Sequence, residues 1–160
     1  MYISYDEYTA LYDTIEEKVF NRLVNVACRF LDRHTTGVDG VKKLKVAFPA
    51  DEESAAAVKH CVAHVVNILV QIQEAENTAS AGRGYTKTDN GLQGKVISSV
   101  SAGNESISFS TGAEKTAVDL AVTDIAQRNK LIYATIRDYL SGITDANGVN
   151  LLYMGAYPRV

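Results

Sequence analysis

Two histidines, His60 and His64, have the spacing of a metal-binding pair on a helix, which is the closest approach to a catalytic motif in this sequence. Four positions apart in a helix, both imidazole rings can face one metal ion. The metalloprotease version of this pattern needs a glutamate directly after the first histidine, and Cys61 stands there instead. His34 or Cys28 would have to supply a third ligand through folding. The pattern weakly indicates a metal-dependent enzyme, and a polar helix face toward solvent or a neighbouring subunit is the simpler interpretation.

A glycine-rich stretch that ends in Gly94-Lys95 superficially resembles a phosphate-binding loop. The P-loop needs a glycine five positions before the Gly-Lys pair and a hydroxyl residue after it, where this chain has Asp89 and Val96. No serine lies in the G-x-S-x-G turn that exposes a nucleophile. We therefore expect no catalytic residue and no cofactor.

The composition favours one domain over residues 1–160. At 46% hydrophobic residues the chain can bury one sizeable core. Its net charge of −3 argues against a protein that binds nucleic acid through the phosphates, although a surface that DNA slides past would tolerate it. Cys28 and Cys61 fall on apolar helical patterns, which favours reduced thiols in a cytoplasm. No secretion signal and no run of eighteen apolar residues is seen, so we expect no membrane association.

The longest helical pattern lies at 51–73 and is the expected centre of the fold. Asp51 suits its N-cap. Its apolar residues recur at spacings of four and three, which places them on one stripe of a helix: Val58, Val62, Val65, Leu69 and Ile72. A stripe this apolar requires other helices to cover it.

Two capping boxes, in which a hydroxyl residue is followed three positions later by glutamate, predict the starts of two N-terminal helices. They are Ser4 with Glu7 and Thr14 with Glu17. The helices are expected at 5–12 and 15–34, and one further long helix at 115–140. The fold class is therefore mainly α, a small helical bundle of two long core helices plus N-terminal helices.

Asn129 is the one polar residue that interrupts the apolar stripe of the last helix. A buried asparagine can fix the register between helices at some cost in stability. Alternatively, the stripe at this point faces solvent or a neighbouring subunit. Asn129 is thus a candidate register or inter-subunit residue.

Three segments outside the helices have distinct compositions. Residues 76–95 are rich in Gly, Ser, Thr and Asn, which predicts a mobile loop. Residues 96–110 alternate apolar and polar side chains around a turn, which predicts a short β-hairpin or extended flap. The C-terminal tail at 149–160 is apolar and aromatic but too short for a core of its own. It either packs back on the bundle or reaches a neighbouring chain.

Five segments and the long apolar helix between them occur in a characteristic order: YISYDEYTALY, FNRLVNVACRFLDRHT, ISSVSAGNESISFS, IRDYLSG and NGVNLLYMGA. Together they resemble the head-tail connector, or adaptor, proteins of long-tailed bacteriophages, particularly those of Gram-positive hosts. The order and spacing carry this resemblance, because the family has no catalytic signature. The linker at 77–95 is long and departs from the pattern.

The resemblance implies a structural virion protein of the neck, assembled in the host cytoplasm, that catalyses no reaction. It implies a homo-oligomeric ring of about twelve copies in cyclic symmetry beneath the portal protein. The ring would extend the DNA channel, let DNA pass without sequence-specific binding, and provide a docking surface for a stopper or tail-completion protein. The resemblance places the interface with the portal or a neighbouring subunit in the C-terminal tail, at Leu151, Leu152, Tyr153 and Tyr157.

Two alternatives remain at this stage. A phage stopper or tail-completion protein would be richer in β-strand than the pattern above. A small metal-dependent enzyme would use His60 and His64.

Overall fold

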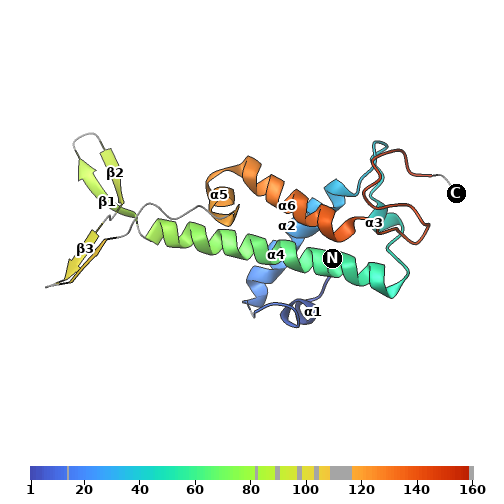
Figure 1. Ribbon diagram of the computed structural model, residues 1–160, viewed down its shortest axis with the longest axis horizontal. Coiled ribbons are helices and arrows are strands. Elements are labelled where there is room, and N and C mark those ends of the chain that lie inside the picture. The colour runs from blue at the N-terminus through green and yellow to red at the C-terminus, as the bar shows by residue number, and fades with distance from the viewer. Residues whose placement is uncertain are drawn as a thin grey trace.

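Helix α4 (Glu52–Ala81) is the longest element of the computed structural model, and the rest of the bundle packs along it (Figure 1). The structure describes residues 1–13, 15–81, 83–88, 91–96, 99–102, 105–108 and 117–158. The predicted stripe of α4 is buried, with Val58, Val62 and Val65 completely inaccessible to solvent. The carboxylate of Asp51 accepts a hydrogen bond from the backbone N–H of Ser54 at 2.7 Å, so the predicted cap is confirmed.

Helix α4 continues beyond Gln73, the predicted end, as far as Ala81. Residues 74–81 contain no glycine or proline, and their three alanines favour a helix. Residues 76–81, expected as the start of a loop, are therefore helical. The segment Glu52–Asn77 is long and apolar enough to cross a membrane. A core helix has the same composition, and here the apolar side chains are buried in the bundle.

One of the two predicted capping boxes is present. Ser4 Oγ accepts a hydrogen bond from the backbone N–H of Glu7, and the Glu7 carboxylate accepts one from the N–H of Ser4. They cap α1 (Tyr5–Thr9), which is shorter than the predicted helix. Helix α2 (Glu17–His34) has Glu16 at its N-cap without a side-chain hydrogen bond. Thr14, the expected cap, lies outside the described residues.

The single helix predicted at 115–140 is two helices, α5 (Ala117–Thr123) and α6 (Ile125–Leu140). Asp124 between them has an extended backbone, and its side chain accepts a hydrogen bond from the N–H of Ala126 at 2.7 Å. The apolar residues keep their helical spacing across the break, so the sequence predicts one helix. Aspartate favours the N-cap position, so a new helix begins after Asp124.

One hydrophobic core joins α1, α2, α4, α5 and α6 to the C-terminal tail. The ring of Tyr8 lies 5.2 Å from that of Phe20, which fastens α1 to α2. The largest buried aliphatic side chains are those of Leu31, Ile132, Ile136, Leu140 and Leu151. The molecule is mainly α, and the predicted small helical bundle is confirmed.

Two short antiparallel ribbons follow α4 and lie beyond its C-terminal end (Figure 1). Strand β1 (Arg83–Thr88) pairs with β2 (Gly91–Val96), and β3 (Ser99–Ala102) pairs with β4 (Glu105–Ser108). The hairpin or flap expected at 96–110 falls partly on residues outside the described ranges and stays a prediction. The mobility expected of 76–95 also stays a prediction, and six of those residues belong to α4.

Candidate functional site

The C-terminal tail is fastened to the rest of the chain by a buried lysine. Lys43 lies in α3 (Lys43–Val46), and none of its surface is exposed. Its ammonium group donates hydrogen bonds to the carbonyl oxygens of Leu151, at 3.1 Å, and Tyr153. It also lies 5.7 Å from the centre of the Tyr153 ring, a cation–π arrangement. Burial lowers the pKa of Lys43, while the charges of Asp145 and Asp39 act in the opposite direction.

Two aspartates hold the tail at further points. The Asp145 carboxylate is buried and accepts hydrogen bonds from the N–H groups of Asn147 and Val149, both at 2.9 Å, and from the Tyr157 hydroxyl at 2.6 Å. Asp39 accepts one from the N–H of Tyr157 at 2.7 Å, and this bond lowers the pKa of Asp39. The tail therefore has a defined path over the connection between α2 and α4.

Because Gly37 has no side chain, the backbone of the tail can contact the backbone of this connection. A Cβ atom at this position would collide with the backbone carbonyl oxygen of Gly155. The neighbouring Val38 donates its N–H to the carbonyl oxygen of Met154 at 3.0 Å. The two segments are thus in backbone contact, and a side chain at Gly37 would displace the tail.

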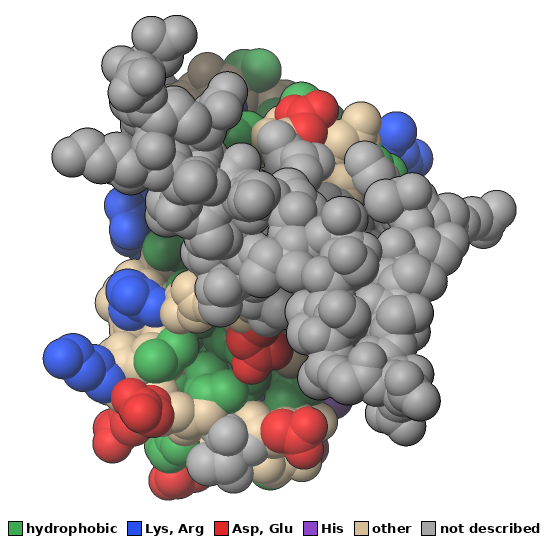
Figure 2. All heavy atoms as spheres, turned by 90° about the vertical axis from the view of Figure 1, so that its left-hand side faces the viewer, with side chains coloured by type: hydrophobic (Ala, Val, Ile, Leu, Met, Phe, Trp, Pro, Cys, Tyr) green, Lys and Arg blue, Asp and Glu red, His purple; other side chains and the backbone are tan. Residues whose placement is uncertain are grey.

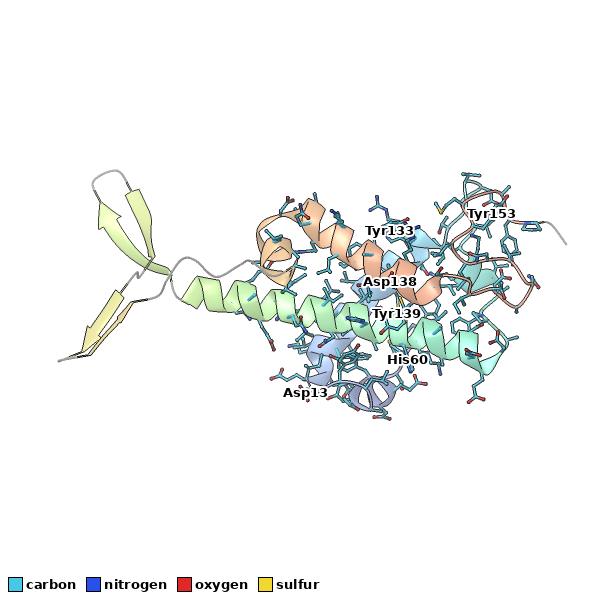
Figure 3. The ribbon with its side chains drawn as sticks, viewed as in Figure 1. Asp13, His60, Tyr133, Asp138, Tyr139 and Tyr153 are labelled. Carbon is cyan, nitrogen blue, oxygen red and sulfur yellow. The ribbon has the colours of Figure 1, made fainter. Side chains whose placement is uncertain are left out.

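Four large apolar side chains are exposed on the tail and on the connection between α2 and α4, which includes α3. They are Val38 (79% exposed), Val46 (61%), Tyr153 (53%) and Met154 (53%), and we call them the tail patch. Tyr153 lies at the end of the molecule opposite the ribbons (Figure 3). The polar contacts beneath the patch fix its backbone, so it is an ordered apolar surface.

The four tail residues predicted to form an interface have different environments. Leu151 is completely buried in the core of its own chain, and Leu152 is half-buried against that core. Tyr157 is half-buried and bonded to Asp145. Of the four, Tyr153 alone is largely exposed. The tail thus packs back on the bundle, and the expectation that Leu151 contacts a partner is corrected, because its side chain stabilises the fold.

Val38, Val46 and Met154 were not predicted as site residues. Val38 lies in an irregular connection and Val46 ends the one-turn helix α3, so no periodicity in the sequence indicates which of these apolar residues are exposed. Asn129 is exposed on α6. It therefore makes no buried contact that could fix the register of the bundle, and its inter-subunit role stays a prediction.

The histidine pair is not assembled with a third ligand in the part of the chain that is described. His60 is exposed beside a shallow hollow of about 180 Å³, and the Nδ1 atom of His64 lies 3.2 Å from the Tyr139 hydroxyl (Figure 3). His34 instead packs against Tyr133, with ring centres 4.9 Å apart. Within the described ranges, no three His, Cys, Asp or Glu side chains form a group that could hold a metal ion.

A hollow of about 540 Å³ lies between the N-terminus and α2. It is lined by Met1, Tyr2, Asn25, Cys28, Arg29, Asp32 and Lys45. The carboxylate of Asp32 is nearly buried and is bonded to the Tyr2 hydroxyl at 2.5 Å and to the Lys45 ammonium at 3.3 Å. Burial raises the pKa of the Cys28 thiol, so the thiol is protonated at neutral pH and is a weak nucleophile.

Comparison of the chain with protein-family models, curated proteins and solved structures found no match.

Proposed function

We propose that this chain is a head-tail connector, or adaptor, of a long-tailed bacteriophage. It is a structural protein of the virion neck that forms a ring of about twelve copies beneath the portal, extends the DNA channel and provides the docking surface for a stopper or tail. The observation that carries this proposal is the tail patch. It is an ordered, exposed apolar surface on the segment whose sequence, NGVNLLYMGA, resembles connectors.

The tail patch has the properties of a protein-docking surface. Val38 and Met154 lie on segments in backbone contact. Exposed apolar patches mark interaction sites, and aromatic residues and methionine are enriched at the centres of interfaces. Lys43 and Asp145 hold the backbone beneath the patch, so binding a partner requires little further ordering of the tail. We therefore assign the patch to the contact with the portal.

The charge of the chain supports the role of a DNA conduit. A net charge of −3 gives little counterion release on DNA, which is the main source of non-specific affinity. A ring of such subunits lets DNA pass through its channel without holding it.

The helical body favours a connector over the first alternative, a stopper or tail-completion protein, for which more β-structure is expected. The second alternative, a metal-dependent enzyme, requires His60 and His64 to share an ion. His64 instead lies beside the Tyr139 hydroxyl. No specific observation favours either alternative.

The first test is native mass spectrometry, with negative-stain imaging, of the protein alone and mixed with the portal from the same genome. We expect rings, free or stacked on the portal. A protein that stays monomeric and does not bind the portal would remove the main support for the proposal.

The second test separates the tail patch from the rest of the surface. We expect V38S/M154S to weaken portal binding by at least about tenfold, because central apolar residues dominate binding energy. Both side chains are exposed, so the melting temperature should change little. The control is I125S, which removes an equally exposed apolar side chain from α6 and should bind the portal normally. Equal binding by V38S/M154S and I125S would refute the assignment of the patch.

A further inference from the structure

The outward side of α2 combines apolar and basic residues. Val26, Arg29, Phe30 and Arg33 recur at spacings of three and four, so they lie on one side of the helix, and they line a groove of about 390 Å³. Val26 and Phe30 form its half-buried floor, while Arg29 and Arg33 are exposed. We call these four residues the α2 face.

The groove adjoins the hollow at the N-terminus. Arg29 also lines the larger hollow at the N-terminus, together with Lys45. The carboxylate in that hollow, Asp32, is already bonded to Lys45 and Tyr2. The α2 face therefore presents two arginines beside an apolar floor, with the nearest acidic group neutralised.

A second surface has the opposite charge. Where α1 leads into α2, four exposed carboxylates flank Leu11, whose side chain is 45% exposed. They are Asp6, Asp13, Glu16 and Glu17, followed by one lysine, Lys18. We call this region the acidic corner.

The two surfaces lie at different ends of α2, with the acidic corner at its start and the α2 face in its second half. In Figure 2 several basic side chains lie along the left edge of the view, and most of the acidic side chains in this view lie in its lower half. Figure 3 places Asp13 and Tyr133 on opposite sides of α4, and Tyr133 packs against His34 at the end of α2. One molecule can therefore use both surfaces at once.

We infer that the α2 face of one copy binds the acidic corner of a second copy. The carboxylates of the corner pair with Arg29 and Arg33, and Leu11 enters the groove floored by Val26 and Phe30. Opposite charges favour this orientation of the two copies and oppose the contact of two like surfaces. Because the two surfaces differ, the contact is head-to-tail and repeats from copy to copy until a ring closes.

This inference rests on the proposed function, since it assigns the contacts between neighbouring subunits of the proposed ring. It is independent of the tail patch, which faces the portal. Because the charges lie at exposed positions, we expect high salt to weaken the contact.

Charge reversal tests the inference. We expect R29E/R33E alone and D13K/E17K alone to lose ring assembly, because the first brings like charges together and the second cancels the negative charge of the corner and places lysines opposite the arginines. Mixed in equal amounts, the two variants should recover it, since each reversed surface then meets a complementary one. The control is D138K, which reverses an exposed acidic residue of α6 and should assemble normally. Circular dichroism and thermal melting check that every variant is folded.

Disulfide trapping gives a second measurement that detects contacts too weak to survive dilution. In a C28S background, which leaves the buried Cys61 as the native thiol, D13C/R33C treated with diamide at high protein concentration should give a ladder of covalent oligomers. The control pair D138C/R33C should give no more than dimers.

The outcomes separate the inference from the proposed function. Normal assembly of R29E/R33E, no recovery on mixing, or no ladder would overturn the inference. A ladder formed by a protein that does not bind the portal would leave the inference standing and count against the proposed function.

Discussion

At the scale of single residues, Lys43 has an unusual set of partners. Its ammonium group is removed from water and is held by two carbonyl oxygens rather than by a carboxylate in direct contact. Hydrogen bonds from a charged donor are stronger than neutral ones, and they are costly to lose when the remaining acceptors stay buried. The position of the C-terminal tail therefore depends on one side chain.

We expect Lys43→Met, which keeps most of the buried volume, to lower the free energy of unfolding by about 1.5–3 kcal/mol, because the carbonyl groups lose their charged donor. Urea denaturation measures the change. The matched control is Lys42→Met at the adjacent exposed position, expected to change stability by less than about 0.5 kcal/mol. Equal stabilities of the two variants would contradict the role of Lys43.

The thiol of Cys61 predicts a dependence of stability on alkaline pH. Burial raises its pKa from 9.0 to about 12. Below pH 9 the thiol is protonated in both the folded and unfolded states, so its contribution is constant. Between pH 9 and 12 the unfolded state releases the proton and the folded state retains it, so stability falls as pH rises.

The slope contributed by one such group reaches at most about 1.4 kcal/mol per pH unit. We expect Cys61→Ala to be less stable than the wild type at pH 8 but to lose less stability between pH 9 and 10.5. Tyrosine and lysine titrations are common to both proteins and cancel in the comparison. Parallel stability curves for the two proteins would show that the thiol is not protected.

At the scale of elements, α4 is tied to its neighbours at both ends of the bundle. Lys59 pairs with Glu7 of α1 at 2.6 Å, and Arg128 of α6 pairs with Glu76 at 2.7 Å. A further bond, at 2.5 Å, joins Arg22 of α2 to Gln73. Exposed pairs of this kind contribute at most about 1 kcal/mol each. They set the orientation of the helices, while the buried stripe of α4 supplies most of the stability.

We expect Asp124→Ala to lower the free energy of unfolding by about 1 kcal/mol, because the first turn of α6 loses its N-cap. Asp138→Ala, at an exposed position inside the same helix, should change stability by less than about 0.5 kcal/mol. Thermal or urea unfolding measures both. A smaller effect at position 124 than at 138 would mean that the break between α5 and α6 does not depend on the cap.

The sequence predicts those elements whose signals are local. The stripe of α4 follows from helical spacing, and the cap of α1 follows from Ser4 and Glu7. The break at Asp124 is not predicted, because the apolar rhythm continues across it. The extension of α4 past Gln73 is not predicted either, because its polar residues carry no periodicity.

The tail patch could be predicted only in part. Tyr153 is identified through the resemblance to connectors, but the exposure of Val38 and Met154 depends on a contact between residues more than a hundred positions apart. The burial of Leu151 depends on the same contact. Spacing along the chain carries no information about such a contact, so the exposed and buried members of the tail cannot be separated from the sequence.

At the scale of the whole molecule, the surfaces assigned to different partners lie apart. The tail patch lies near the start of α4, and the ribbons lie beyond its other end (Figure 1). The α2 face and the acidic corner lie on the sides. This separation fits a subunit that contacts a portal and two neighbours at the same time.

Two truncations distinguish the structural part of the tail from its exposed end. We expect deletion of 151–160 to lower the free energy of unfolding by at least about 3 kcal/mol, because Leu151 leaves a cavity and Lys43 loses its acceptors. Deletion of 155–160 keeps both features and should cost clearly less. Urea denaturation of the two proteins tests this. Equal effects would mean that residues 155–158 supply the stability of the tail.

Lys43 lies 108 residues before Leu151, whose carbonyl oxygen it binds. During synthesis the lysine leaves the ribosome long before its partner exists, and it stays hydrated until Leu151 and Tyr153 emerge. Val38 and Met154 are brought together by the same late event. A chain released before that point can form helices but does not present the tail patch. The dependence of the tail on Lys43 therefore links the formation of the tail patch to synthesis of the chain as far as Tyr153.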